Sequence, residues 1–443
     1  MTTKKQVNKK EKRKFHINQK LIISLIIIFI GLYIGMVIIA IFGYNPLTLF
    51  TATWEGNFSS LKEFGNFLSV FTWMTFIGLG ALVSFRAKIF NIGIFAQMVA
   101  GGLFGYLFAA LVLWPGRIGV MFSILIPVAT GIFIALLIAF LKNRYNINIV
   151  VSSIMLNWIV FWIYRYFRNP INAPYLFNGG SVPMNIDPSN SLRFDWLTNL
   201  FPGSTINIGI ILLVIIVPLI WFLYSKTSFG IKQGIIASSE DISLYSGINY
   251  KSEIYKAMAL SGALSGLAGA TFYLGTNQSL PVVGNDLPLE PFNGITIALI
   301  GFNNPIGAVF GSLFISLFEN AKVYLNVYSD ENIVDFIMGI IVLFISGANY
   351  FLIYSPQTKI VNWINKKQEV KLEQKTNTKD MKKDKTIETE NQYKDQKKQK
   401  EYKIIALEKG KKANTVYKQQ YLKMKNRKKN KHEEKVDKGG NSE

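Results

Sequence analysis

Long runs of apolar residues recur between residues 21 and 354, separated by short polar segments. A membrane-crossing helix needs about 20 mostly apolar residues, because the hydrocarbon core of a bilayer is about 30 Å thick. The pattern predicts an all-α polytopic membrane protein with about ten transmembrane helices, eight of them full-length. The candidate segments are Leu21–Phe42, Phe67–Ser84, Ile92–Trp114, Gly119–Leu141, Ile147–Tyr164, Ile206–Tyr224, Ile254–Leu274, the short Phe292–Ile300, Ile306–Glu319 and Val334–Tyr354.

The first apolar run, Leu21–Phe42, contains no charge and follows the strongly basic segment Lys4–Lys20. A cleaved signal peptide is the alternative interpretation of such a run. The run is longer than a signal-peptide core, and no clear small-residue cleavage site follows it. We therefore interpret it as a membrane span.

Charge divides the chain into three parts. Lys and Arg number 48 and Asp and Glu number 27, which gives a net charge of +21. Most of the excess lies in a basic N-terminal tail, residues 1–20, and in a lysine-rich C-terminal tail, residues 356–443. Residues 21–355 are nearly neutral and form the predicted transmembrane domain. The basic balance therefore does not indicate a nucleic-acid-binding domain.

The basic residues between the spans predict the orientation, because cytoplasmic loops carry an excess of Lys and Arg. Both tails and the loops that contain Arg86, Lys88, Lys142, Arg144 and Lys226–Lys256 are expected in the cytoplasm. Both termini then lie inside, which requires an even number of spans. Arg117 and three arginines in the loop 165–205 depart from this pattern: Arg165, Arg168 and Arg193.

The C-terminal tail from residue 366 is rich in Lys, Gln, Glu and Asn and poor in aromatic residues. Such a composition buries too little apolar surface to offset the entropy of ordering, so most of the tail is expected to be disordered. The segment Tyr402–Leu422 has enough apolar content for a surface helix. A solvated cytosolic tail is one interpretation, attraction to anionic membrane lipid is a second, and nucleic-acid binding is a remote third.

The chain lacks the residues for several kinds of catalytic and metal-binding site. The chain has no cysteine, its two histidines, His16 and His432, lie in the tails, and no phosphate-binding loop motif occurs. We predict no catalytic residues, no metal site and no cofactor. Ionisable residues are scarce within the spans, apart from Glu319, Lys322 and Asp335 near span ends. An ion-coupled carrier usually needs such groups at mid-depth, so we expect the energy to come from another chain.

Polar residues enter two spans. Asn91, Gly93 and Gln97 lie at the start of one apolar run, where a broken helix is tolerated only if protein or a water-filled cavity receives the freed backbone groups. In a second run, Asn157 shares a helix face with Ser153 and is followed by Trp158. An amide beside an aromatic ring suits a nucleobase or sugar. The alternative in both cases is hydrogen bonding between neighbouring helices.

Local sequence signals predict a short amphipathic helix in the longest predicted cytoplasmic loop, about residues 226–253. Residues Ser238–Asp241 form a helix start, Ile242 and Leu244 follow on an apolar face with Tyr245, and Gly247 is a stop. A hydrophobic and acidic knob of this kind fits a groove in a partner. An ordinary structured loop is the alternative.

Glycine patterns mark two further segments. Gly262 and Gly266 are four residues apart, a spacing that lets helices approach closely. Asn293-Gly294 interrupts another apolar run, and both this run and the earlier one open with Phe-Asn. Broken segments at matching places in two halves are typical of a central binding site, so we predict two pseudo-repeated halves.

These segments together resemble the permeases of ABC importers of the branched-chain amino acid, ribose and nucleoside class. In particular, the chain is similar to nucleoside permeases that work with a lipoprotein of the basic membrane protein type. The resemblance covers roughly Leu68–Tyr354 and rests on four ordered stretches: 86–98 (RAKIFNIGIFAQM), 150–157 (VVSSIMLN), 259–270 (ALSGALSGLAGA) and 294–307 (GITIALIGFNNPIG). One position departs: Phe95-Ala96 replaces the Glu-Gly that is common in the nucleoside members.

The resemblance implies a multi-pass permease subunit in a bacterial inner membrane, without its own ATPase site. Its expected partners are an ABC ATPase, a second permease in a homo- or heterodimer, an extracellular substrate-binding lipoprotein and membrane lipid. The resemblance also implies that the loop around Ile236–Ile248 is the coupling helix, with Ser238, Glu240, Asp241, Leu244, Tyr245 and Gly247 facing the ATPase. The residues expected along the substrate pathway are Asn91, Gln97, Asn157, Trp158 and Asn293.

The substrate is expected to be a nucleoside, with ribose, galactose or another sugar as the alternative. Two hypotheses of other classes are an ion-coupled secondary transporter and a membrane scaffold whose basic tails recruit partners. The first predicts uptake that follows an ion gradient, and the second predicts that only removal of residues 356–443 abolishes function.

Overall fold

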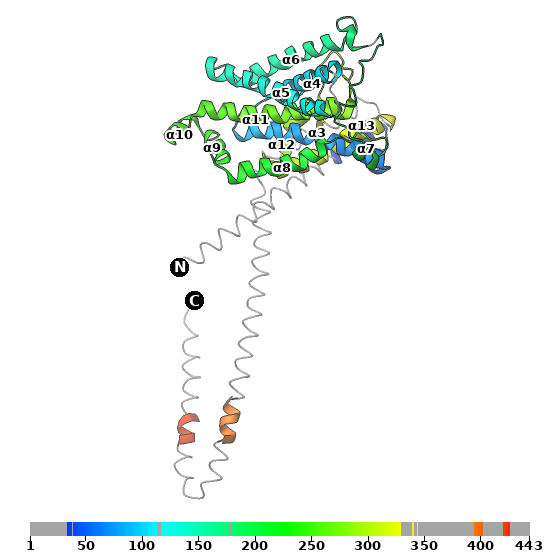
Figure 1. The fold of residues 1–443 in the computed structure, drawn as a ribbon. Helices are drawn as coiled ribbons and strands as arrows, with labels where there is room; N and C mark the ends of the chain where they lie inside the picture. The colour runs from blue at the N-terminus through cyan, green and yellow to red at the C-terminus, as the bar shows by residue number, and fades with distance from the viewer. Residues whose placement is uncertain are drawn as a thin grey trace. The chain divides into compact units, whose positions relative to one another are not determined.

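The computed structural model describes residues 33–37, 39–112, 117–177, 179–328, 339–340, 343, 394–401 and 420–425. The regular structure of these residues is helical (Figure 1). The chain forms two units, Met1–Tyr354 and Ser355–Glu443. In the second unit, residues 394–401 and 420–425 are helical, and the remaining expectations for the tail lie outside the described residues.

The elements of the first unit follow in chain order: α2 Thr48–Phe58, α3 Leu61–Arg86, α4 Ile94–Leu111, α5 Ile118–Tyr145, α6 Ile149–Arg168, η1 Pro174–Leu176, α7 Asp195–Leu200, α8 Gly209–Lys226, α9 Ser228–Ile236, α10 Glu240–Tyr245, α11 Tyr250–Ala270, the π-helical η2 Thr271–Asn277, η3 Glu290–Phe292, α12 Asn293–Ile300 and α13 Pro305–Tyr328.

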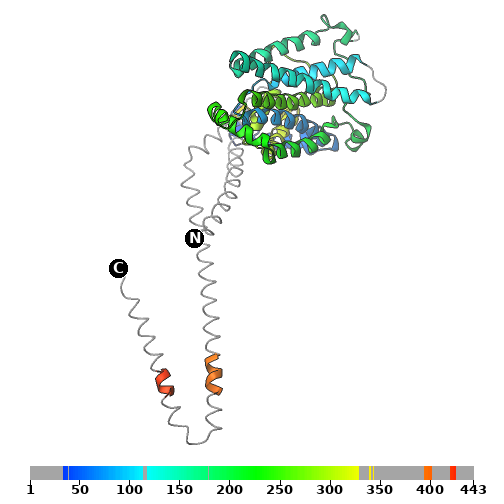
Figure 2. The ribbon, with the colours of Figure 1, turned by 60° about the vertical axis from the view of Figure 1, so that its left-hand side comes forward.

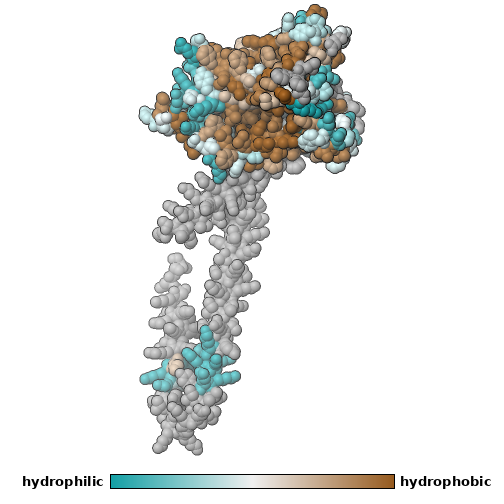
Figure 3. Space-filling view, viewed as in Figure 1, coloured by the Kyte–Doolittle hydropathy of each residue, from teal (hydrophilic) through white to brown (hydrophobic). Residues whose placement is uncertain are grey.

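Seven of these helices are long and apolar enough to cross a membrane: α3, α4, α5, α6, α8, α11 continued by η2, and α13. They confirm seven of the predicted spans, and the short predicted piece Phe292–Ile300 matches α12. An apolar band covers the middle of the helices between polar ends (Figure 3). Two predicted spans, Leu21–Phe42 and Val334–Tyr354, lie largely outside the described residues. The count of eight to ten spans and the sidedness of the termini therefore remain predictions.

Helix α13 is longer than the predicted segment Ile306–Glu319, because hydrogen bonds with α2 accommodate polar groups of both helices. The side chain of Asn57 on α2 donates to the carbonyl oxygen of Leu317 at 2.8 Å, and Asn320 on α13 donates to the carbonyl oxygen of Gly56 at 2.7 Å. These bonds satisfy amide groups that hydropathy counts as interruptions. Helix α2 itself was not among the predicted elements, since its sequence is short and mixed.

Helices α3 and α11 lie inside the bundle, while α8 and α6 lie on its outer sides (Figures 1 and 2). The most apolar stretch of α3 is 83% buried and that of α11 is 78% buried, against 22% for α8. Helix α11 packs directly against α5. A Cβ atom added to Gly262 would lie 2.3 Å from the carbonyl oxygen of Gly131, so only glycine permits this approach. The prediction that Gly262 and Gly266 allow close helix packing is confirmed.

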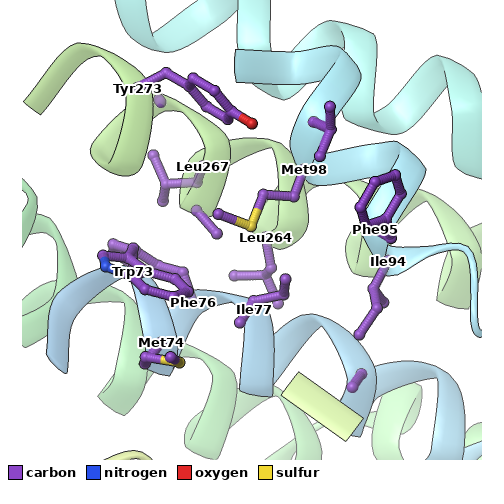
Figure 4. Packing of buried hydrophobic residues seen from close by; sticks show 14 of the residues in the cluster. Trp73, Met74, Phe76, Ile77, Ile94, Phe95, Met98, Leu264, Leu267 and Tyr273 are labelled. Carbon is purple, nitrogen blue, oxygen red and sulfur yellow. The ribbon is translucent and has the colours of Figure 1, made fainter. Parts of the chain in front are cut away.

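Large apolar side chains fill the space between α3, α4 and α11 (Figure 4). Trp73 and Phe76 of α3, Met98 of α4 and Leu264 and Tyr273 of the α11–η2 segment are 0–5% exposed. This apolar centre keeps the three inner helices together. It therefore fixes the geometry of the polar residues near their ends.

Three of the four arginines that depart from the predicted charge pattern have structural roles. Arg168 donates to the carbonyl oxygen of Leu280 at 3.0 Å, Arg117 donates to that of Pro188 at 3.1 Å, and Arg193 donates to those of Gly275 and Thr276. Burial lowers the pKa of Arg193 from its ordinary value. These guanidinium groups fasten the loop between α6 and α8 to the end of the bundle, which explains their position without reference to membrane orientation.

Candidate functional site

The break between α3 and α4 is stabilised by Asn91. Its side-chain oxygen accepts a hydrogen bond from the backbone N–H of Gly93 at 3.0 Å, a local turn that starts α4 one residue later. A Cβ atom added to Gly93 would lie 2.5 Å from Cδ1 of Ile138, so the turn presses closely on α5. The apolar run itself is not interrupted: α4 is continuous from Ile94 to Leu111, and Asn91 and Gly93 lie in the turn that connects it with α3.

Asn91 also connects the break to α11 and α3. Its amide nitrogen donates to Oγ of Ser261 at 3.2 Å, and this hydroxyl donates to the carbonyl oxygen of Gly80 at 2.7 Å. The amide nitrogen of Gln97 lies 3.5 Å from the side-chain oxygen of Asn91. Asn91, Gln97 and Ser261 are all 0% exposed. One amide thus joins three helices through a short buried network.

Asn157 of α6 caps the start of α4 from outside that helix. Its side-chain oxygen accepts from the backbone N–H of Ala96 at 3.1 Å, and its amide nitrogen donates to the carbonyl oxygen of Ile92 at 3.3 Å. The first N–H groups of a helix have no partner within the helix. Asn157 supplies such a partner, for the N–H of Ala96, from the neighbouring helix. This explains why its amide is only 2% exposed.

Three polar atoms beside this network have no hydrogen-bond partner among the described residues: Oε1 of Gln97, Oγ of Ser153 and Oγ of Ser265. Ser153 lies next to Gly93, and Ser265 lies next to Gly80. We call the set the polar centre; it comprises Asn91, Gln97, Ser153, Asn157, Ser261 and Ser265. Buried polar atoms without partners are rare and each needs an explanation, so the polar centre is the candidate for function inside the bundle.

The other two predicted pathway residues lie apart from the polar centre. Trp158 is 39% exposed and packs its ring against Phe161 at a centroid distance of 5.7 Å. The amide of Asn157 faces α4 instead, so the amide and the aromatic ring do not form one surface. Asn293 begins α12 and donates to Oε2 of Glu319 at 3.4 Å.

The second break nevertheless touches the first through a ring contact. Phe292, which precedes Asn293, stacks on Phe95 of α4 with ring centroids 5.4 Å apart and an angle of 13° between the planes. Phe95 stands where the nucleoside members of the resembled class commonly carry Glu. Here an apolar contact between α4 and the start of α12 occupies that position.

The predicted short helix in the loop between α8 and α11 is confirmed as α10. Ser239 is its N-cap and accepts from the backbone N–H of Ile242 at 3.0 Å, and Gly247 follows with a φ of +68°. Ile242, Leu244 and Tyr245 are 49%, 64% and 93% exposed. We call these three side chains the knob. Ser238, Glu240 and Asp241 are also exposed, so the predicted face of the loop is accessible along its length.

Apolar packing connects the knob region with the polar centre. Ile236 of α9 and Ile254 of α11 share a buried cluster with Ala87 and Ile89, which belong to the break between α3 and α4, and with Ile138 of α5. Ile138 in turn faces Gly93. The sequence pattern did not single out this cluster or Ser261, although the i, i+4 spacing of Ser261 and Ser265 on a glycine-rich helix is a signal for both serines.

Among the described residues, no group of three His, Cys, Asp or Glu side chains is placed to hold a metal ion. The chemistry that the polar centre offers is hydrogen bonding by amides and hydroxyls. Such groups can form hydrogen bonds with one another and with polar solutes.

Comparison with known proteins now adds to this geometry. The family described as branched-chain amino acid transport system / permease component matches residues 64–346. The guanosine ABC transporter permease protein NupP of Bacillus subtilis is 27% identical over 330 residues, which cover 74% of this chain and 93% of that protein. The nucleoside ABC transporter permease protein NupB of Lactococcus lactis is 27% identical over 350 residues, 77% of this chain and 95% of that protein.

A sugar permease is also similar. The glucose ABC transporter permease protein TsgB13 of Haloferax volcanii is 22% identical over 286 residues, which cover 62% of this chain and 74% of that protein. No solved structure matches the chain.

Proposed function

Because the chain belongs to the family of branched-chain amino acid transport system permease components, we propose that it is the membrane subunit of an ABC importer that carries nucleosides. The observation that carries the proposal is the similarity to two nucleoside permeases over more than nine-tenths of their lengths. The membrane-spanning bundle and the buried amides of the polar centre support it.

Sugar transport is the second candidate, and the glucose permease of Haloferax volcanii favours it. A nucleoside contains a ribose, so hydroxyl and amide groups such as Asn91 and Gln97 suit both solutes. The two classes differ in the base, which needs an apolar or aromatic surface as well as hydrogen bonds. Competition between unlabelled guanosine and unlabelled ribose or glucose distinguishes them.

In the proposed mechanism, the polar centre lies beside the pathway and responds to its opening. Asn91, Gln97 and Asn157 hold the first turn of α4. The unpaired oxygens of the polar centre would gain partners when α4 shifts relative to α6 and α11. Trp158 and Asn293 are the remaining pathway candidates, on the outer face of α6 and at the second break.

The knob is the proposed docking surface for the ABC ATPase. Leu244 and Tyr245 are large apolar side chains exposed at the end of the bundle that also carries Lys142 and Lys226. Exposed apolar patches rimmed by polar residues are typical of protein interfaces. Closure of the ATPase on ATP would push α10 toward the apolar cluster around Ile236 and so reach the break at Asn91.

The proposal implies a complete assembly. The chain would pair with a second permease, itself or a related chain, and receive solute from an extracellular binding lipoprotein while embedded in membrane lipid. The loop 226–253 and the tails 1–20 and 356–443 would face the cytoplasm, with the transmembrane domain at 21–355. ATP hydrolysis would occur in the partner, which is why the chain needs no phosphate-binding motif.

The test is reconstitution. The chain is purified from its native membranes with the ATPase and permease that accompany it, inserted into liposomes, and supplied with the co-purified binding protein and tritiated guanosine. We expect guanosine accumulation that requires ATP on the ATPase side and that unlabelled uridine reduces more than unlabelled glucose. Accumulation with an ion gradient and without ATP would contradict the proposal and support a secondary transporter.

A matched control uses the chain alone in the same liposomes. We expect it to accumulate no guanosine under a sodium or proton gradient. Deleting residues 356–443 provides a second control: uptake that is lost on deletion, while substitutions of Asn91 and Gln97 leave uptake normal, would support the scaffold hypothesis instead.

A further inference from the structure

We infer that Gln233 and Glu253 act together as a positioning device that fixes the knob to α11, so that movement of α10 is passed to the bundle. The amide nitrogen of Gln233 on α9 donates to Oε2 of Glu253 on α11 at 3.1 Å. The two helices lie on either side of α10 in the sequence. This inference rests on the proposed function, since it names how the docking surface is coupled.

Burial makes the contact specific. Gln233 is 0% exposed and Glu253 is 3% exposed, although both lie near the end of the bundle, where water is close. A buried carboxylate is costly unless it is paired and hydrogen-bonded. Glu253 meets this need with Gln233 and with Nζ of Lys256 at 2.7 Å, so the side chain is held on two sides.

Exposed residues flank α10 on either side, and the segment after it is held at Ile248, which packs against the cluster of Ile236 and Ile254. Ser238 and Gly247 are exposed, and Gly247 has a φ of +68°. Within α10, Ser243 is the buried residue, and its hydroxyl bonds back to the carbonyl oxygen of Ser239 in the same turn. Buried contacts that join α9 to α11 directly include the Gln233–Glu253 bond and the apolar cluster that contains Ile236 and Ile254.

The apolar cluster and the hydrogen bond have different mechanical properties. Apolar side chains such as Ile236 and Ile254 can slide over one another, because the hydrophobic effect is non-directional. A hydrogen bond weakens steeply with misalignment and so fixes one register. Helix α11 continues through η2 to Asn277 and carries Ser261 of the polar centre, so a fixed register transmits displacement along the whole helix.

The first experiment measures position without any substrate. The chain contains no cysteine, so a Tyr245→Cys substitution carries a single nitroxide label on the knob. In the purified full-length chain without the ATPase, where the knob is uncovered, we expect Q233L and E253A to increase the mobility of this label in the electron paramagnetic resonance spectrum. The matched control K251A changes an exposed residue of the same turn of α11 and should leave the spectrum unchanged.

A second label at Tyr145, which is exposed at the end of α5, should be unaffected in all variants. E253Q retains a group that bonds to Gln233 and should preserve the spectrum. An unchanged Tyr245→Cys label in both Q233L and E253A would overturn the inference. Equal mobility in E253Q and E253A would also overturn it, because the charge and not the hydrogen bond would then be responsible.

The second experiment measures coupling in liposomes with the co-purified ATPase and tritiated guanosine. We expect Q233L and E253A to raise the ATP hydrolysed per guanosine by about three- to tenfold, the usual range for residues in a coupling network. E253Q and K251A should keep the wild-type ratio. A merely structural defect would lower hydrolysis and uptake together, and an unchanged ratio would count against the inference.

The two proposals fail separately. A wild-type complex that hydrolyses ATP but transports no guanosine would refute the proposed substrate, while the label at Tyr245→Cys would still decide whether Gln233 and Glu253 position the knob. Normal guanosine uptake with a label that is unaffected by Q233L and E253A would refute only the positioning device.

Discussion

The knob and the polar centre depart from the usual distribution of side chains in opposite directions. The knob places Leu244 and Tyr245, 64% and 93% exposed, on an end of the bundle. The polar centre places Asn91 and Gln97, both 0% exposed, among apolar helices. The first arrangement leaves apolar surface without a covering element, and the second leaves polar atoms without partners.

The difference indicates what each region needs for its function. Apolar surface at an end of the bundle is covered by another protein, so the knob indicates an external partner. An unpaired buried polar atom costs about 1–3 kcal/mol, which another arrangement of the same helices can recover. The polar centre therefore indicates a second conformation of the helices or a polar solute nearby. Unlike the knob, it depends on contacts within the chain.

The largest expected effect comes from placing charge on the knob. In the double variant E240K and L244K, a lysine would be buried in the docking groove without a counter-ion. A cost of about 3 kcal/mol, typical of an unpaired buried charge, weakens binding more than a hundredfold at about 1.4 kcal/mol per tenfold. We expect guanosine uptake and ATPase co-purification to be lost while the amount of chain in the membrane is unchanged.

Tyr145→Lys is the control for the knob variant, since Tyr145 is also exposed and apolar but lies at the end of α5. It should retain uptake. Normal uptake by the E240K and L244K double variant would show that α10 is not the docking surface, and the exposure of the knob would then need another explanation.

The second prediction concerns stability, and it addresses the polar centre. N91A removes the bonds to Ser261 and Gly93 and the contact with Gln97. At about 0.6 kcal/mol for an average hydrogen bond between membrane helices, three contacts amount to about 2 kcal/mol of lost stability. Thermal unfolding in detergent, followed by tryptophan fluorescence, measures this. The variant N91S should lose less, because its hydroxyl can still accept from the N–H of Gly93.

The spans were predictable because they depend on local composition. Apolar runs such as those in α5 and α8 determine a membrane helix by length alone. Their burial was not predictable: the runs of α11 and α13 are equally apolar, but one is 78% and the other 39% buried. In a membrane, an apolar side chain suits both lipid and protein, so sequence hydropathy does not distinguish the inner helices from the outer ones. Close contacts such as Gly262 with Gly131 decide it.

The candidate sites divide in the same way. The knob follows from neighbouring residues, a Ser cap, an apolar face and Gly247, and its helix was predicted nearly to the residue. The polar centre joins residues far apart in the sequence, so Asn91, Gln97, Ser153 and Asn157 were anticipated from local anomalies, and Ser261 was not. The sequence pattern also placed Trp158 beside Asn157, but adjacent residues on a helix face different neighbours.

The third prediction tests whether Asn157 stabilises the start of α4. N157A removes the acceptor for the N–H of Ala96 and the donor to the carbonyl oxygen of Ile92. Two interhelical bonds correspond to about 1 kcal/mol, half the effect of N91A. The same unfolding measurement compares them. W158F serves as control, because it keeps an aromatic ring at a residue that makes no hydrogen bond to the polar centre. A larger loss in W158F than in N157A would contradict the assignment of the cap.

The smallest expected effect concerns the second break and tests whether the two Phe-Asn breaks are equivalent. Asn293 is partly buried and donates one long hydrogen bond, 3.4 Å, to Glu319. N293A should therefore cost only about 0.5 kcal/mol, well below N91A, and uptake then reports its role in the pathway directly. A fall in guanosine uptake of tenfold or more, which corresponds to about 1.4 kcal/mol, would exceed the structural loss and indicate substrate contact. If N293A instead destabilised the chain as much as N91A, the second break would be a structural centre equal to the first, and the symmetry suggested by the sequence would extend to their energetics.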